Sequence, residues 1–215
     1  MDTHSSQPAC AATDSQIDAV LSFWFGPDPS DSEVLAPFRA RWFSASRALD
    51  REIVERFRGT LEAAARGELD DWAASARGRL ALIVLFDQFS RNIHRGTGQA
   101  FAYDQRALEL SIAGIAMGLD LKLSAVERVF FYMPFQHAET LAVQVRSVEL
   151  FESLAREHAD LHMRNLAQSC AEYARQHHAI IAEFGRFPHR NRLLERASTR
   201  DETMFLRDGG PTFGQ

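Results

Sequence analysis

The sequence predicts an all-α protein of about six to seven helices. In nearly every segment the apolar residues recur at positions i, i+3, i+4 and i+7, which is the spacing of one helix face. No segment alternates apolar and polar residues as a half-buried strand does. The 215 residues are 46% hydrophobic and 25% charged, an ordinary globular composition that excludes a disordered chain, a coiled-coil rod and a membrane-dominated protein.

The first three helices are expected before residue 97. Asp14 can cap the first helix, which ends at Gly26, and a second helix ends at Gly67. A third begins near Gly78, and we interpret its apolar run, residues 80–86, as a buried helix because Leu and Ala dominate it. The apolar faces of the first two helices are Ile17, Val20, Leu21, Trp24 and Phe25, and Leu49, Ile53, Phe57, Leu61 and Ala64.

The later helices have clear boundaries. A fourth covers about residues 100–117, and Ser124-x-x-Glu127 is a capping box that opens a fifth. Pro134 should bend or break that helix, and a sixth ends at Gly185. Thr199-x-x-Glu202 caps a short last helix through residue 206. The inward-facing residues expected here are Phe101, Leu108, Ile112 and Ile115; Leu141, Val145, Val148, Phe151 and Leu154; and Leu166, Cys170, Tyr173, His177, Ile181 and Phe184.

This pattern predicts a single helical domain over residues 14–206, with a disordered tail at 1–13 and a loose tail at 207–215. Residues 1–13 lack the basic start and apolar run of a signal peptide, and Cys10 and Cys170 do not suggest a disulfide framework. The longest apolar run has seven residues, against the roughly 20 of a membrane span. We therefore expect a cytoplasmic protein without a membrane partner. The net charge of −5 argues against a nucleic-acid partner.

Two polar stretches, residues 87–96 and 185–191, each follow an apolar helix and each contain Arg-Asn. Guanidinium groups suit carboxylates and phosphates, so one interpretation is a pocket for a small anionic ligand. A second interpretation is helix capping, and a third is an interhelical network in which Asp87 and Asp104 pair with the arginines. The candidate ligand-binding residues are Arg91, Asn92, Arg95, Arg186, His189, Arg190 and Asn191, with Arg192 as a further guanidinium.

Proton-handling candidates follow the Pro134 bend. His137 and Glu139 are nominated for this role if the protein catalyses a reaction, because a proline can open room for a ligand. Taken alone, His137 is interpreted first as a histidine satisfied inside the core, with proton transfer as the alternative, and the same interpretation is favoured for His177. His158 and His162 have zinc-compatible spacing but no third ligand nearby, so no metal is predicted. No motif predicts a cofactor.

Several motifs together resemble the bacterial "domain of unknown function 924" family over about residues 17–206. They are Val20-Leu-Ser-Phe-Trp-Phe25, Arg41-Trp-Phe43, the run 80–89 with Arg91-Asn92 and Arg95-Gly96, Phe101-Ala-x-Asp104, Phe131-Tyr-Met-Pro-Phe135 with His137 and Glu139, and Phe184-Gly-Arg-Phe-Pro-His-Arg-Asn191 with Ser198-Thr199. The resemblance implies an all-helical fold of antiparallel hairpins with tetratricopeptide-like packing, and it implies no reaction. This chain has Ser90, His94, Ala138 and Glu195 where the family usually has Pro, Tyr, Ser and Gly.

Two functions remain open at this point. The first is the pocket for a small anionic molecule, which we favour because the polar residues concentrate in a few short motifs. The second is a tetratricopeptide-like module that grips a peptide or protein, with the arginines as recognition anchors or as a structural network. The sequence predicts no oligomeric state and leaves enzymatic activity open. The anion pocket requires that the two polar stretches meet in space.

Overall fold

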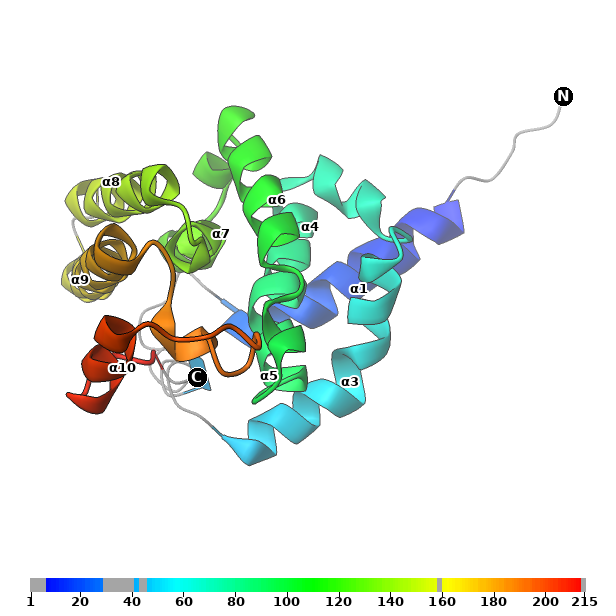
Figure 1. Ribbon diagram of the computed structural model, residues 1–215. Coiled ribbons are helices and arrows are strands. Elements are labelled where there is room, and N and C mark those ends of the chain that lie inside the picture. Colours follow the sequence, from blue (N-terminus) through cyan, green and yellow to red (C-terminus); the bar gives the residue numbers. More distant parts are fainter. Residues whose placement is uncertain (1–6, 29–40, 43–45, 158–159, 214–215) are drawn as a thin grey trace, which may run out of the picture.

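The computed structural model describes residues 7–28, 41–42, 46–157 and 160–213, and within these ranges every regular element is helical (Figure 1). The predicted all-α class is therefore confirmed. The helices outnumber the six or seven expected, because short turns of other helix types divide several of them. The elements are α1 (Gln7–Phe25), α3 (Arg47–Ala65), η1 (Asp70–Ala74), α4 (Ala76–Ile83), η2 (Val84–Phe89), α5 (Ser90–Ile93), η3 (Gly98–Phe101), α6 (Asp104–Ala116), η4 (Asp120–Lys122), α7 (Ala125–His137), α8 (Leu141–Glu157), α9 (Leu161–Phe184), η5 (Pro188–Arg190) and α10 (Arg200–Arg207).

The apolar run at 80–86 is a buried helix, as expected, and it lies in the middle of the molecule. α4 contacts α1, α6 and α7, while α8 and α9 pack side by side beyond α7 (Figure 1). The ring of Trp24 meets Phe89 and Phe130 edge-on, at centroid distances of 5.4 and 5.7 Å. Aromatic contacts of this kind connect the first helix to the central ones.

Several predicted helix signals are confirmed. All five residues expected on the apolar face of the second helix are buried in α3. Both capping boxes form, Ser124 with Glu127 and Thr199 with Glu202. Gly185 ends α9 with φ at 69°, a left-handed conformation that glycine adopts without a steric penalty.

Four residues expected to face inward are exposed: Ile112, Leu141, Val145 and Tyr173. On α8 the buried face instead begins with Gln144 and Ser147, two polar residues that hide its position in the sequence. On α6 the buried face uses small residues, because α7 lies too close for larger ones. A Cβ added at Gly114 would be 2.5 Å from the ring of Phe131.

The ends of the fold also differ from the expectation. α1 begins at Gln7, inside the range expected as a tail, so Asp14 lies within the helix and is not its N-cap. At the other end, Phe213 stacks on His177 with ring centroids 3.7 Å apart. Its φ of 52° is rare for a bulky residue and persists only where the surroundings hold it.

Pro134 does not break its helix at once. α7 continues through it to His137, and a new helix begins at Leu141. The amide of Gln144 donates hydrogen bonds to the carbonyls of Phe135, Gln136 and Ala138 at 3.3, 2.7 and 2.7 Å. This buried amide satisfies the last carbonyls of α7 and thereby fixes the position of His137.

None of the helices in the described ranges combines the length and the apolar character needed to cross a membrane.

Candidate functional site

A π-helical turn, η2, carries the central acid of the site. The amide of Ser90 donates to the carbonyl of Leu85, five residues earlier, which is the π pattern. Such turns are rare and are often found at functional sites. η2 places Asp87 in the interior with no exposed surface.

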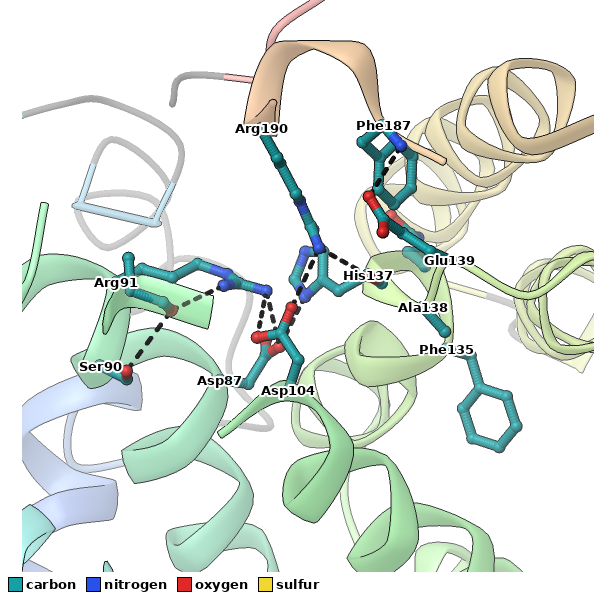
Figure 2. A network of polar contacts seen from close by, with 12 residues as sticks. Asp87, Ser90, Arg91, Asp104, Phe135, His137, Ala138, Glu139, Phe187 and Arg190 are labelled. Atoms are coloured by element: carbon teal, nitrogen blue, oxygen red, sulfur yellow. Dashed lines mark hydrogen bonds and ion pairs between the residues drawn. The ribbon is translucent and has the colours of Figure 1, made fainter. Parts of the chain in front are cut away.

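Asp87 holds one nitrogen of His137. Oδ1 of Asp87 lies 2.5 Å from Nδ1 of His137 and 3.4 Å from Nη2 of Arg91 (Figure 2). Oδ2 accepts from Gln88 at 2.5 Å. Burial alone would raise the pKa of Asp87, but His137 and Arg91 outweigh it and lower that pKa to about 2. An ionised carboxylate only accepts, so Nδ1 of His137 carries a hydrogen. Nε2 is then the nitrogen that remains to exchange a proton or to contact a ligand.

The two polar stretches meet at Asp104, the first residue of α6. Its Oδ1 lies 3.0 Å from Nη2 of Arg91, and its Oδ2 accepts from Nη1 of Arg190 at 3.1 Å (Figure 2). Arg91 and Arg190 come from α5 and η5 and are 99 positions apart in the chain, counted from their numbers. The convergence that the anion pocket requires is therefore present for these two arginines.

Arg190 is held rigidly. It is only 5% exposed, and its guanidinium lies 4.6 Å from the ring centroids of both Phe101 and Phe187. Nη1 also donates to the carbonyl of His137 at 3.1 Å. Burial and the charge of Arg91 lower the pKa of Arg190 to about 10.

A pocket of about 310 Å³ opens beside this cluster. Its wall combines ionisable groups with apolar side chains, and this mixture is typical of small-molecule sites. The lining residues are Gly98, Phe101, Ala102, Asp104, Gln105, Leu108, His137, Ala138, Glu139, Thr140, Arg190 and Leu194. Three of the predicted site residues, His137, Glu139 and Arg190, thus share one pocket with Asp104.

Glu139 lines the pocket, but both of its oxygens are engaged. Arg196 donates to Oε2 at 2.5 Å and to Oε1 at 2.9 Å, and the amide of Phe187 donates to Oε1 at 2.8 Å. Burial would raise the pKa of Glu139, but these donors outweigh it and lower the pKa. The geometry favours a structural role, in which Glu139 ties the end of α7 to the loop around η5.

Arg186 and Asn191 belong to a neighbouring cluster around Glu202. Arg186 donates to the two oxygens of Glu202 at 2.6 and 2.8 Å, and Asn191 donates to the same carboxylate at 3.2 Å. The hydrogen bonds from Arg186 lower the pKa of Glu202 to about 2. Glu202 is also the N3 residue of the last capping box, so this cluster anchors α10 to the loop after α9.

Asn92 and Arg95 face away from the pocket, toward α3. Asn92 donates to Asp50 at 2.8 Å, and Arg95 donates to the same carboxylate at 2.7 and 2.9 Å. Arg192 lies at an exposed position and does not line the pocket. The sequence pattern grouped these residues with Arg91 and Arg190 because they are adjacent in the chain. Neighbouring positions on a helix point in different directions, so adjacency alone does not place them in one pocket.

His177 and His189 lie behind the pocket. The ring of His177 is 6.3 Å from that of His137, and its Nδ1 lies 2.7 Å from the carbonyl of Tyr173. Burial lowers the pKa of His177 to about 3 and that of His189 to about 4. Both histidines therefore stay neutral at physiological pH, and the described part of the chain provides no hydrogen-bond partner for Nδ1 of His189.

The sequence interpretation missed Arg196 and the two aromatic rings at Arg190. Arg196 lies among five arginines between residues 186 and 200, and that density was the available signal. Among the described residues no three His, Cys, Asp or Glu side chains gather in a way that could hold a metal ion. His158, half of the weak zinc pair, lies outside the described residues.

Comparisons with known proteins identify the fold but no activity. The profile of a family described as bacterial protein of unknown function (DUF924) matches residues 20–210. A solved structure of a protein of unknown function, ATU0120 from Agrobacterium tumefaciens, is similar with 36% identity and a TM-score of 0.76. The match covers 92% of this chain and 99% of that one. No curated protein matches the chain.

Proposed function

Because the chain belongs to the bacterial family of unknown function DUF924, which supplies a fold and no reaction, we propose from its own residues that the pocket at Arg190 binds a small anionic molecule. The observation that carries this proposal is the setting of Arg190. A guanidinium that contacts two aromatic rings and forms part of a pocket wall is fixed in place before any ligand arrives. Preorganised donors of this kind lose little entropy when they bind an anion.

Unused hydrogen-bonding capacity supports the same proposal. Nε of Arg190 and Nε of Arg91 are buried, and neither has a hydrogen-bond partner among the described residues. Buried donors without hydrogen-bond partners are rare in folded proteins, so each one needs an explanation. Acceptors on a bound anion, directly or through a water molecule, would supply these partners.

His137 is the group in this pocket that we nominate for proton transfer if the protein is an enzyme. Asp87 orients its ring and leaves Nε2 unengaged among the described residues. We assign Glu139, Asp104 and Asp87 to the framework that positions Arg190 and His137.

The binding proposal is tested by thermal unfolding in the presence of sodium benzoate, hexanoate, acetate, phosphate and sulfate. A ligand at 100 times its Kd stabilises by about 2.7 kcal/mol, which for a chain of this size raises Tm by roughly 5–10 °C. We expect at least one anion to raise the Tm of the wild type. Arg190→Lys keeps the charge but loses the planar fork, and it should abolish most of this shift.

Two controls separate binding from folding. Arg175→Lys changes an arginine on the outer face of α9 that pairs with Glu152 and Glu172, and it should leave the shift unchanged. Ala102→Trp fills the pocket from an exposed position and should abolish the shift while the protein remains folded. If no anion stabilises the wild type, or if Arg190→Lys and Ala102→Trp respond as the wild type does, the proposal is wrong.

A protein-interaction module with tetratricopeptide-like helix hairpins is the second candidate. It is favoured by Leu141 and Val145, two exposed apolar residues four positions apart on α8. We rank it lower because Arg190, expected as a recognition anchor, is buried. In this case Leu141→Asp would impair function and Arg190→Lys would affect only stability.

A further inference from the structure

The charged groups around His137 balance one another. Among the described residues, one chain of ion pairs runs from His137 through Asp87, Arg91 and Asp104 to Arg190, and a separate pair joins Glu139 to Arg196, so these three carboxylates and three guanidinium groups have a formal charge of zero when His137 is neutral. The acids are Asp87, Asp104 and Glu139, and the arginines are Arg91, Arg190 and Arg196. Among the described residues, the ring of His177 lies 6.3 Å from that of His137, and His189 acts on His177 from beyond it; both are neutral at physiological pH because burial lowers their pKa values.

This balance limits the charge of the ligand. A monoanion added to a neutral, largely buried set leaves one uncompensated negative charge, which is unfavourable away from water. A dianion such as phosphate leaves two, and Asp104 and Glu139 in the same pocket wall would repel it further. The group in the pocket that can supply one compensating positive charge is His137, through Nε2.

The shape of the pocket limits the rest of the ligand. The volume of about 310 Å³ equals that of roughly ten water molecules at about 30 Å³ each. Among the polar lining residues, Arg190 and His137 are the two that carry or can carry a positive charge, and the large apolar side chains of the wall are Phe101, Leu108 and Leu194. A carboxylate with a short aliphatic or aromatic tail satisfies both parts.

We propose that this pocket binds a small monocarboxylate with an apolar tail, and that binding takes up one proton at Nε2 of His137. The carboxylate contacts the guanidinium of Arg190 and the newly protonated imidazole, and the tail lies against Phe101 and Leu108. Asp87 stabilises the imidazolium from the opposite side of the ring through Nδ1. This inference rests on the proposed function, because it specifies the ligand of the same pocket.

The test is calorimetric titration with benzoate, hexanoate and acetate in two cationic buffers, bis-tris and imidazole, which differ in ionisation enthalpy. The difference in apparent heat gives the number of protons taken up. We expect an uptake approaching one proton and an affinity that weakens by up to tenfold per pH unit as the pH rises. Hexanoate should bind more tightly than acetate, by up to about fourfold for each buried methylene.

The variant His137→Asn tests whether His137 is the residue that takes up the proton. Its side-chain amide can still donate to Asp87 in place of Nδ1, but it has no atom equivalent to Nε2. This variant should bind benzoate more weakly and without proton uptake. His162→Gln, at an exposed position on α9, is the matched control, and His189→Gln tests whether this half-buried histidine takes up the proton instead. Histidine ring signals of the wild type, followed by NMR during benzoate addition, report the same protonation without any substitution.

The outcomes separate the two proposals. Binding of a carboxylate without proton uptake, or uptake that persists in His137→Asn, overturns this inference and leaves the proposed function intact. Tighter binding of phosphate than of benzoate also overturns it. If none of the anions binds, the proposed function fails and this inference fails with it. Uptake in the wild type that is lost in His137→Asn and kept in the two other histidine variants supports it.

Discussion

At the scale of single residues, the buried carboxylate of Asp87 accepts from the side chains of Gln88, Arg91 and His137. Removing one partner of a buried ion pair leaves the other charge uncompensated, and this typically costs about 3–5 kcal/mol. The stability of the polar cluster and the orientation of His137 therefore depend on the same carboxylate.

Asp87→Asn tests the ionisation of this residue. The pKa of Asp87 is about 2 in the folded protein against an ordinary value of 3.8, so its ionised form stabilises the fold above about pH 4. That stabilisation is lost as the pH falls from about 4 to about 2, and it amounts to about 2 kcal/mol. Urea unfolding between pH 5 and 2 should show the wild type losing about 2 kcal/mol more than Asp87→Asn does. Asp71→Asn, an exposed control, should follow the wild type, and parallel profiles of wild type and Asp87→Asn would contradict the assignment.

The sequence indicated the region of the candidate site rather than its lining, because of its nine catalytic or ligand-binding candidates only His137, Glu139 and Arg190 line the pocket. It indicated that Arg91 and Asp104 could pair and that Arg190 belonged with them, because charged residues in apolar surroundings need partners. It grouped Asn92 and Arg95 with Arg91, although they contact Asp50 on another helix. The ion pair between Glu139 and Arg196 depends on a loop conformation that no local sequence pattern specifies.

At the scale of elements, the segment after α10 covers the rear of the site. Phe213 stacks on His177 and meets Phe187 and His189 edge-on. The glycine and polar residues around Phe213 indicated a loose tail. The contacts of Phe213 come from distant parts of the chain, which the local composition does not reveal. Burial under this ring contributes to the low pKa of His177.

Phe213→Ala should uncover that histidine. Without the ring, the desolvation of His177 decreases and its pKa rises from about 3 toward the ordinary 6.5. A histidine NMR titration of the full-length chain measures this change, with His162 as the reference signal. Phe213→Leu, which keeps an apolar cover, should show a smaller rise. An unchanged titration of His177 in Phe213→Ala would mean that this residue does not provide the cover.

Helix faces were predictable where apolar residues define them and unpredictable where small or polar residues do. α3 has the expected face because five apolar residues fill it. α8 buries Gln144 and Ser147, and α6 buries Ser111 and Gly114, so their faces are rotated from the expected ones. These positions are determined by close packing and by the carbonyls at the end of α7, which are tertiary features.

At the scale of the whole molecule, aromatic rings connect helices that are distant in the chain. Phe130 of α7 contacts Trp24, Phe25 and Trp42 at centroid distances of 5.1–5.7 Å. Contacts of this kind between the first and the central helices favour cooperative unfolding, as the proposal of a single domain over residues 14–206 requires.

Phe130→Ala tests this cooperativity. The residue is 1% exposed, so its truncation should destabilise the fold by about 3–5 kcal/mol. Unfolding followed by far-ultraviolet circular dichroism and by tryptophan fluorescence should shift together to a lower midpoint. Met117→Ala, at an exposed position, should change the midpoint little. Two separate transitions would show that the chain contains more than one cooperative unit.

The π turn at Val84–Phe89 depends on the number of residues in this stretch as well as on their identity. A π turn is in effect an α-helix with one residue inserted, and each residue of an α-helix rotates the chain by about 100°. Because the wide turn absorbs the extra residue, a relative one residue shorter here could keep the same buried helix, the same core and the direction of its Arg91 equivalent, but it would lose the wide turn that carries Asp87. A gap in an alignment at this turn would therefore mark relatives in which the carboxylate that holds His137 is placed differently.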